Sequence, residues 1–379
     1  MIYLDHLSTT PCAPEVIEAM RSSLEERFGN PSSAHALGWI AREEVEESRA
    51  TLARLLGVRP QRVTLTSGAT EASYLALEGA MSAILSEGGT PSSILSQRSE
   101  HSATLGTLQA LSVRHGVELK LAPLSPLGQV DIEAFADRLD PSVKLVSVMH
   151  VNNELGVIQP IEALTQLVRE RAHPTCLIHV DGAQAVGKLN VDLSALDVDL
   201  YSLSAHKFYG PKGVGALVTW LRGPRANTSL PRVLFGGGQE RGVRPGTVAT
   251  HQAVGIGVAA GLVSARHSVD LEHTSRLSSL LLSELSALGA SLTAEGPRVS
   301  GALSLRCPPA LYERVVDRWA GEVIFSQSSA CHSGKGSPSH VLSALGLSAE
   351  EASRVIRLCV GRYTREDEVK RAISLLQDT

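Results

Sequence analysis

Cysteine and aromatic residues are scarce in this 379-residue chain. The five cysteines, Cys12, Cys176, Cys307, Cys331 and Cys359, are widely scattered and include no Cys-x-x-Cys pair. That pattern disfavours a disulfide framework and a zinc site, so we expect no bound metal and a reducing compartment. Aromatic residues make up 4% of the chain and do not interleave with a basic stripe, so we expect no direct binding of nucleic acid.

Long apolar runs and a strong net charge are also missing. No run reaches the length of a membrane span, and the formal net charge is −4. The first residues lack a basic stretch followed by an apolar one, so we expect no signal peptide, no membrane association and a cytoplasmic protein. Apolar residues make up 43% of the chain and charged residues 20%, a balance typical of a protein with a large core.

Strand-like apolar runs alternate with helical patterns over the first 250 residues. Residues 63–66 precede a helical pattern at 71–85, and residues 144–149 precede another at 160–171. A further run at 92–96 leads into a helix after His101. This order predicts an α/β fold with a large, mostly parallel sheet and helices on both faces. Ligands of such folds bind at the carboxyl ends of the strands.

The pattern changes after about residue 252. A long helical stretch at 252–288 is followed by a weaker strand at 300–305 and by helical patterns near 311–320, 338–346 and 365–377. We therefore expect two domains: a large one over residues 16–251, and a smaller α+β domain formed by residues 1–15 and 252–379.

Two neighbouring strand ends carry residues that suit pyridoxal phosphate. The run at 176–180 ends in Asp181, and the run at 198–203 leads into Ser204-Ala205-His206-Lys207. A lysine amine forms a Schiff base with this cofactor, and a carboxylate pairs with its protonated pyridine nitrogen. The alternative is that Asp181 caps a helix and that Lys207 is a solvated loop lysine.

A second cluster, residues 66–71 (Thr-Ser-Gly-Ala-Thr-Glu), lies between a strand and a helix. Small residues at a helix N-terminus let backbone N–H groups approach an anion, and the helix dipole favours negative charge there. We expect this turn, with Thr70, to hold the cofactor phosphate alongside Ser204 and His206. Simple capping of the helix is the alternative.

Other strand ends carry His101, the pair Asn152-Asn153, and Gln184. A histidine such as His101 can stack on the pyridine ring and transfer protons, although a lone histidine is more often structural. An amide N–H can donate to the phenolic oxygen of the cofactor, and an Asx turn is the alternative for the two asparagines.

Arg357 and Cys331 lie in the last third of the chain. Arg357 interrupts an apolar run and needs a partner, which a substrate carboxylate or a structural ion pair would supply. Cys331 lies in a Ser/Gly-rich stretch with His332 and Lys335, whose positive charge would lower the pKa of the thiol. Chance exposure of a surface cysteine is the alternative.

Together these motifs resemble the cysteine desulfurases of the NifS/IscS type, within the class V aminotransferase superfamily. The resemblance covers nearly the whole chain and is specific in its order and spacing. It includes Tyr3-Leu4-Asp5, residues 28–33, the phosphate turn, Glu100-His101, residues 152–154, 179–181, 204–213, 236–241 and 244–247, Ser329-Ala330-Cys331 and Arg357.

The resemblance implies fold type I of the pyridoxal-phosphate enzymes and a role for each matching residue. Lys207 would form the Schiff base, Asp181 would pair with the pyridinium, and His101 would stack on the ring. Gln184 and Asn153 would bond the phenolic oxygen, and Arg357 would bind the substrate carboxylate. The backbone of Ala69 would hold the phosphate together with Thr70, Ser204 and His206. Thr247 would reach the phosphate of a neighbouring subunit, which implies a homodimer.

The implied reaction converts L-cysteine to L-alanine, with Cys331 as the sulfur acceptor. The persulfide on Cys331 would pass to an acceptor protein in iron–sulfur assembly, tRNA thiolation or DNA phosphorothioation. One alternative is a selenocysteine lyase, because the dipeptide His332-Ser333 is similar to the sequence of those enzymes. The other is an aminotransferase or lyase of the same fold that does not need Cys331. A catalytically silent scaffold that binds the cofactor is disfavoured because Lys207, Asp181, His101 and Cys331 are all present.

Overall fold

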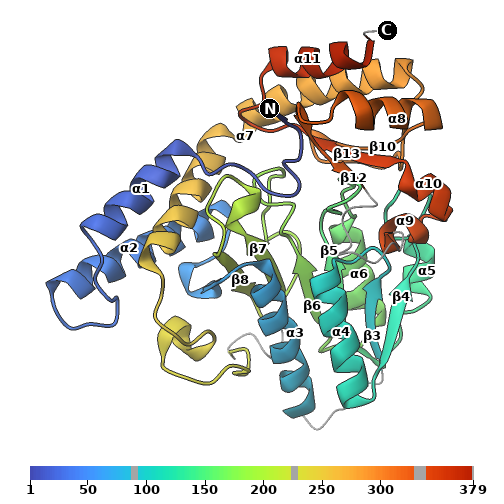
Figure 1. The fold of residues 1–379 in the computed structure, drawn as a ribbon. Coiled ribbons are helices and arrows are strands. Elements are labelled where there is room, and N and C mark those ends of the chain that lie inside the picture. Colours follow the sequence, from blue (N-terminus) through green and yellow to red (C-terminus); the bar gives the residue numbers. More distant parts are fainter. Residues whose placement is uncertain (87–92, 223–228, 328–338, 378–379) are drawn as a thin grey trace.

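A seven-stranded sheet forms the centre of the protein (Figure 1). The structure is a computed structural model that describes residues 1–86, 93–222, 229–327 and 339–377. The strand order across the sheet is β2-β8-β7-β6-β5-β3-β4. The strands are β2 (Val63–Thr66), β3 (Ser93–Gln97), β4 (Glu118–Ala122), β5 (Val143–Met149), β6 (Leu177–Asp181), β7 (Leu200–Ser204) and β8 (Gly215–Thr219).

Most neighbouring strands of this sheet run parallel, which confirms the predicted α/β class. β7, β6, β5, β3 and β4 pair in parallel, whereas β8 is antiparallel to both β7 and β2. Parallel pairing places the ends of β6 and β7 at the same edge of the sheet. Asp181 is the last residue of β6, and Lys207 ends the short 3₁₀ turn η2 (Ala205–Lys207) that directly follows β7.

Helices cover both faces of the sheet because the strands are apolar on both sides. Helices α3 (Ala69–Ser86) and α4 (Ser102–His115) pack on one face, where Leu145 and Leu177 are buried. Helices α2 (Ala36–Leu55), α6 (Ile161–Arg171) and the first half of α7 (Thr250–Ala287) pack on the other, against Val146 and Ile178. α1 (Pro14–Glu25) lies beside α2 and α7 (Figure 1).

A four-stranded antiparallel sheet lies near the two ends of the chain (Figure 1). Its order is β12-β13-β10-β9, from strands β9 (Ser291–Leu292), β10 (Ala302–Arg306), β12 (Ser326–Gln327) and β13 (Val355–Cys359). Helices α8 (Pro309–Arg318) and α11 (Glu366–Gln377) cover it around the buried Trp319. The short strands β1 (Ile2–Tyr3) and β11 (Val323–Ile324) pair in parallel beside it.

One 38-residue helix, α7, joins the two cores. Ile256 near its start packs with the large sheet, and Leu281 near its end packs with the small one. The remaining described elements are short: η1 (Pro60–Arg62), α5 (Ile132–Ala136), η4 (Gln239–Gly242), α9 (His340–Ala344) and α10 (Ala349–Ser353). No helix in the described ranges combines the length and the apolar composition that crossing a membrane requires.

Candidate active site

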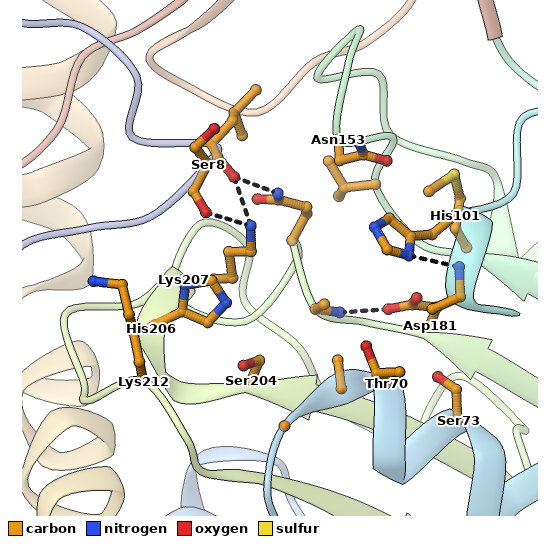
Figure 2. A pocket seen from close by; sticks show the side chains of 18 of the residues that line it. Ser8, Thr70, Ser73, His101, Asn153, Asp181, Ser204, His206, Lys207 and Lys212 are labelled. Atoms are coloured by element: carbon orange, nitrogen blue, oxygen red, sulfur yellow. Dashed lines mark hydrogen bonds between the residues drawn. The ribbon is translucent and has the colours of Figure 1, made fainter. Parts of the chain in front are cut away.

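A cavity of about 590 Å³ lies at the carboxyl ends of the parallel strands (Figure 2). Apart from Thr247 and Cys331, the residues to which the sequence resemblance gave a role all line it. They are Ala69, Thr70, His101, Asn153, Asp181, Gln184, Ser204, His206, Lys207 and Arg357. These residues come from separate strand ends, and the parallel topology brings them together.

Lys207 is held by the N-terminal segment of the chain. Its Nζ donates to the carbonyl oxygens of Leu7, at 2.8 Å, and Ser8, at 2.7 Å (Figure 2). Burial, together with the positive charges of Lys188 and Arg357, lowers the pKa of this amine to about 7. At neutral pH a substantial fraction of Lys207 is therefore the neutral amine, which can act as a nucleophile or a base.

Asp181 faces Lys207 from the opposite side of the cavity (Figure 2). Its Oδ1 accepts from the backbone N–H of Ala183 at 3.0 Å, and its Oδ2 accepts from the Thr104 hydroxyl at 3.4 Å. Glu100 is fully buried nearby, and both of its carboxylate oxygens lack a hydrogen-bond partner. Burial and the charge of Asp181 raise the pKa of Glu100 well above its usual value, so Glu100 is the neutral acid near pH 7.

The N-terminus of α3 forms the floor of the cavity. Gly68 has a φ of 154°, which glycine adopts readily and other residues do not, and it directly precedes the helix. The first N–H groups of a helix have no acceptor within the helix, so those beside Ala69 and Thr70 are available to an anion. The Ser73 hydroxyl, one turn further on, is buried without a hydrogen-bond partner and lines the same cavity.

His206 and Ser204 lie at the same end of the cavity as this helix terminus (Figure 2). Nδ1 of His206 lies 3.1 Å from the Thr9 hydroxyl. Burial, together with Lys207, Lys212 and Lys188, lowers the pKa of His206 to about 4, so the ring is neutral near pH 7. The neutral imidazole, the Ser204 hydroxyl and the Lys212 ammonium can all donate to an anionic group.

His101 is the N-cap of α4. Its Nδ1 accepts from the backbone N–H of Ala103 at 3.2 Å, so in the neutral ring the proton is on Nε2. This bond sets the position of the ring, which projects into the cavity between Asn153 and Asp181 (Figure 2).

Asn152 and Asn153, the predicted pair, have different structural roles. Oδ1 of Asn152 accepts from the N–H groups of Glu154 and Leu155, and its Nδ2 donates to the Ser99 carbonyl, so Asn152 forms the expected Asx turn. That turn places Asn153 on the cavity wall. Gln184, also on the wall, donates from Nε2 to the Leu7 carbonyl at 2.7 Å.

Arg357 lies in the middle of β13, as its apolar setting predicted, and its guanidinium reaches the cavity. Nη1 donates to the Asn153 carbonyl, and Nη2 donates to the side chains of Asp5, Ser8 and Ser326. The structure therefore contains the ion pair that the sequence offered as the alternative to a substrate carboxylate, and it also places the guanidinium at the cavity. Nε remains buried without a partner.

Two predicted residues do not line the main cavity. Thr247 lines an adjoining cavity of about 180 Å³ together with Arg244, and Ser67 and Gly213 border both cavities. The turn before Thr247 is held by Glu240, whose carboxylate forms a buried bidentate pair with Arg49. Cys331 lies outside the described residues.

Several residues of the site were not found from the sequence. Ser8, Ser73 and Lys188 lie outside the motifs that were given a role, and Lys212, although it lies within residues 204–213, was given none. All four reach the site through tertiary packing. Only Ser73 gave a usable signal, because it lies one helical turn after Ala69 and Thr70 and so shares their face of α3. In the described parts of the chain, no three His, Cys, Asp or Glu side chains cluster as metal ligands do.

Comparison with known proteins identifies the family. The chain matches the aminotransferase class-V family over residues 2–372. It is 40% identical to "Cysteine desulfurase IscS" of Methylococcus capsulatus, an alignment that covers 100% of this chain and 92% of that relative. Among solved structures it resembles a "NIFS-LIKE PROTEIN", with a TM-score of 0.90, 32% identity and coverage of 99% and 98% of the two chains. It also resembles "SspA in complex with cysteine", with a TM-score of 0.82, 31% identity and coverage of 96% and 100%.

This chain belongs to the class-V aminotransferase family, which confirms the resemblance seen in its sequence and the predicted fold. Enzymes of this family use pyridoxal phosphate, and pyridoxal phosphate is the cofactor of this chain. The cavity fits such a group, because a helix N-terminus, an unpartnered Ser73 hydroxyl, the buried Asp181 carboxylate and the Lys207 amine all line it.

Proposed function

We propose that this chain is a pyridoxal-phosphate-dependent cysteine desulfurase, which converts L-cysteine to L-alanine and carries the sulfur as a persulfide on Cys331. The observation that supports this most strongly is the convergence of Lys207, Asp181, His101 and Arg357 on one cavity. The full-length similarity to a cysteine desulfurase supports the same reaction.

In this proposal each residue of the cavity binds a different part of the cofactor. Lys207 forms the covalent link, Asp181 pairs with the pyridine nitrogen, and His101 stacks on the ring. When bound, the cofactor supplies an electron sink for the charge left on the substrate Cα. Asn153 and Gln184 donate to its phenolic oxygen. The phosphate is held by the backbone N–H of Ala69 and by the side chains of Thr70, Ser204 and His206.

Arg357 and Lys207 then act on the substrate. Arg357 binds the α-carboxylate of L-cysteine, since its buried Nε is without a partner and its other nitrogens are already fixed by four acceptors. Lys207 removes the proton from Cα, a role that suits an amine whose pKa is lowered to about 7. The carbonyl oxygens of Leu7 and Ser8 hold Nζ in place between steps.

Cys331 supplies the nucleophile for sulfur transfer. Its thiolate attacks the substrate sulfur, the new S–S bond forms as the S–Cβ bond breaks, and the carbon skeleton takes up that electron pair and protons to leave as alanine. The described flanks support this role. Ser326 bonds Arg357, and Ser339 bonds Glu154, which adjoins Asn153. Cys331 follows Ser326 by five positions, a span of at most about 18 Å in extended chain.

A homodimer and an acceptor protein complete the proposal. Large apolar side chains are exposed around the turn between α1 and α2, with Phe28 69% and Trp39 59% exposed, and a second copy of the chain would cover them. Thr247, in its own cavity beside the phosphate turn, would contact the cofactor phosphate of that copy. The acceptor would belong to iron–sulfur assembly, tRNA thiolation or DNA phosphorothioation. Replacing Trp39 by Asp is expected to yield monomers in sedimentation or light scattering.

The domain division and the compartment remain proposals. We propose a large domain over residues 16–251 and a small one over 1–15 and 252–379, supported by the separate cores around the two sheets. We also propose a cytoplasmic location. The described cysteines, Cys12, Cys176, Cys307 and Cys359, form no disulfide with one another, as a reducing compartment favours.

The test is to purify the protein with its cofactor, add L-cysteine with a thiol reductant, and measure alanine and sulfide. Equal amounts of the two are expected. Cys331→Ser should retain the visible absorbance of the cofactor and lose sulfur transfer. A fully active Cys331→Ser enzyme would contradict the role of this residue and favour another lyase of the fold. Turnover of selenocysteine but not of cysteine would favour a selenocysteine lyase.

A further inference from the structure

A second lysine, Lys188, lies directly behind Lys207. Its Nζ donates to the backbone carbonyl of Lys207 at 3.1 Å and to Oε1 of Gln184 at 3.2 Å. Lys188 therefore touches two residues of the proposed cofactor site without lining the main cavity itself. The proposed reaction gives Lys188 no role.

The turn that carries Lys188 is built to pack against Lys207. Gly187 has a φ of 85°, and a Cβ added to it would lie 2.5 Å from the Cβ of Phe208, the residue after Lys207. Any residue other than glycine would therefore push the two segments apart. The N–H of Lys188 donates to the Ala185 carbonyl at 3.0 Å, which closes the turn.

The first consequence of this contact is the orientation of the Gln184 amide. An ammonium group can only donate hydrogen bonds, so the group that faces Lys188 must be Oε1. Nε2 then points the other way, where it donates to the Leu7 carbonyl at 2.7 Å and has one further hydrogen to give. If the Gln184 amide were reversed, Oε1, an acceptor, would face the phenolic oxygen of the cofactor, which needs a donor in the proposed site.

The second consequence is electrostatic, because the charge of Lys188 is not neutralised. In the described ranges no carboxylate forms an ion pair with Lys188, and Asp270, on the wall of the same small cavity, pairs with Arg362. His267 and Tyr209 also line this small cavity, and three further titratable groups near Lys188, namely His6, Cys359 and His206, are neutral near pH 7. Burial lowers the pKa of His6 to about 4 and raises the pKa of the Cys359 thiol to about 11, and His206 is neutral as described above.

The charge of Lys188 therefore acts on Lys207, whose protonated form it disfavours. Desolvation lowers the pKa of Lys188 itself to about 8, so most of the charge is present at pH 7. We propose that Lys188 is a positioning residue that fixes the orientation of the Gln184 amide and, through its charge, favours the neutral form of the Lys207 nitrogen. The proposal rests on the proposed function, in which Lys207 carries the cofactor.

The test compares Lys188→Met with Lys188→Arg in the cofactor-loaded enzyme. The visible absorbance is titrated with pH, since it reports protonation of the linkage between Lys207 and the cofactor. Lys188→Met is expected to raise the midpoint by about one pH unit, which is about tenfold in proton affinity. Lys188→Arg retains the charge and is expected to leave the midpoint within about 0.3 unit of the wild type.

Turnover supplies a second readout. Lys188→Met should lower kcat by about tenfold and change KM for L-cysteine by less than about twofold, because Arg357 is untouched. A folded, cofactor-loaded Lys188→Met enzyme with an unshifted midpoint would overturn the proposal. If Lys188→Met does not fold, Lys188→Gln removes the charge and keeps a polar side chain, and an unshifted midpoint in that variant would overturn the proposal equally.

One control separates this inference from the proposed function. In Lys207→Ala, borohydride should no longer fix the cofactor to the chain. If fixation at the site persists in Lys207→Ala, the assignment of Lys207 fails, whatever the Lys188 variants show. If fixation is lost but the midpoint in Lys188→Met is unchanged, the proposed function stands and the role of Lys188 falls.

Discussion

Arg357 and Asp5, which lie at opposite ends of the chain, form an ion pair of 2.8 Å inside the candidate site. Both side chains are mostly buried, at 10% and 13% exposure. Ser8, from the same N-terminal segment, bonds the same guanidinium, and its backbone carbonyl accepts from Lys207. Residues 5–8 therefore contact both the proposed substrate-binding arginine and the proposed base.

We expect Asp5→Asn to lower KM for L-cysteine severalfold. The carboxylate of Asp5 lies where it repels a substrate carboxylate bound to Arg357, and Arg357 keeps its contacts to Ser8, Ser326 and the Asn153 carbonyl. Loss of the ion pair should lower the free energy of unfolding by about 1–2 kcal/mol. This loss is smaller than the one expected for a buried arginine that keeps no partner, because Arg357 retains its other hydrogen bonds. Steady-state kinetics and denaturant unfolding measure the two effects. Arg357→Ala should raise KM instead, by about 100-fold.

The matched control for Asp5→Asn is Asp367→Asn, which removes a carboxylate from an exposed ion pair with Arg365. That change should alter neither KM nor stability measurably. A rise in KM for Asp5→Asn would mean that Asp5 serves to orient Arg357 rather than to compete with the substrate.

The activity should depend on pH through Lys207. A base must be neutral to accept a proton, and the pKa of Lys207 is lowered to about 7, chiefly by burial. Activity is therefore lost as the pH falls through about 7 and is nearly constant above about 8, whereas an ordinary lysine would require a pH near 10. A profile of kcat against pH measures this, because kcat reports groups of the enzyme–substrate complex, in which Lys207 acts as the base. An activity that continues to rise through pH 9 would contradict the assignment.

Ser73 is expected to bind the cofactor phosphate. Its hydroxyl is buried at the cavity without a partner, and an unpartnered buried hydroxyl is costly. Ser73→Ala should therefore weaken cofactor binding by about 5–10-fold without lowering the stability of the cofactor-free protein. Ser96→Ala is the matched control, because the Ser96 hydroxyl is also buried and unpartnered but does not line the cavity. Equal cofactor affinities for the two variants would exclude this role for Ser73.

The strands and helices of the large sheet were largely readable from hydrophobic pattern. Residues 63–66 form β2 as predicted, and the helix predicted over 252–288 is α7, Thr250–Ala287. The direction of β8 was not readable. Its apolar residues fit a buried strand of either direction, and the direction is set by pairing with β7 and β2.

The site was predictable only where a motif names its residue. Lys207 and Asp181 end consecutive strands in the chain, and parallel pairing makes those ends neighbours in space. Lys188 and Asp5 have no such relation to the site. Lys188 reaches Lys207 through the packing of Gly187 on Phe208, and Asp5 reaches Arg357 across 352 residues. Contacts of this kind depend on the tertiary fold, so no local pattern records them.

Glu100 gives the last prediction, a pH-dependent stability. The group is fully buried beside Asp181 with both oxygens unpartnered, and its pKa in the folded protein is raised well above 4.5. The unfolded chain loses this proton near pH 4.5, whereas the folded protein keeps it, so the contribution of Glu100 to stability is complete below pH 4.5 and is lost as the pH rises toward the folded pKa.

Glu100→Gln mimics the protonated acid and has no proton to lose. We therefore expect its free energy of unfolding to exceed that of the wild type by a margin that grows by more than about 1 kcal/mol between pH 5 and pH 8. Denaturant unfolding of both proteins, each without cofactor, at several pH values measures the margin. If the margin stays constant over this range, Glu100 is ionised in the folded protein, contrary to the raised pKa that its burial implies.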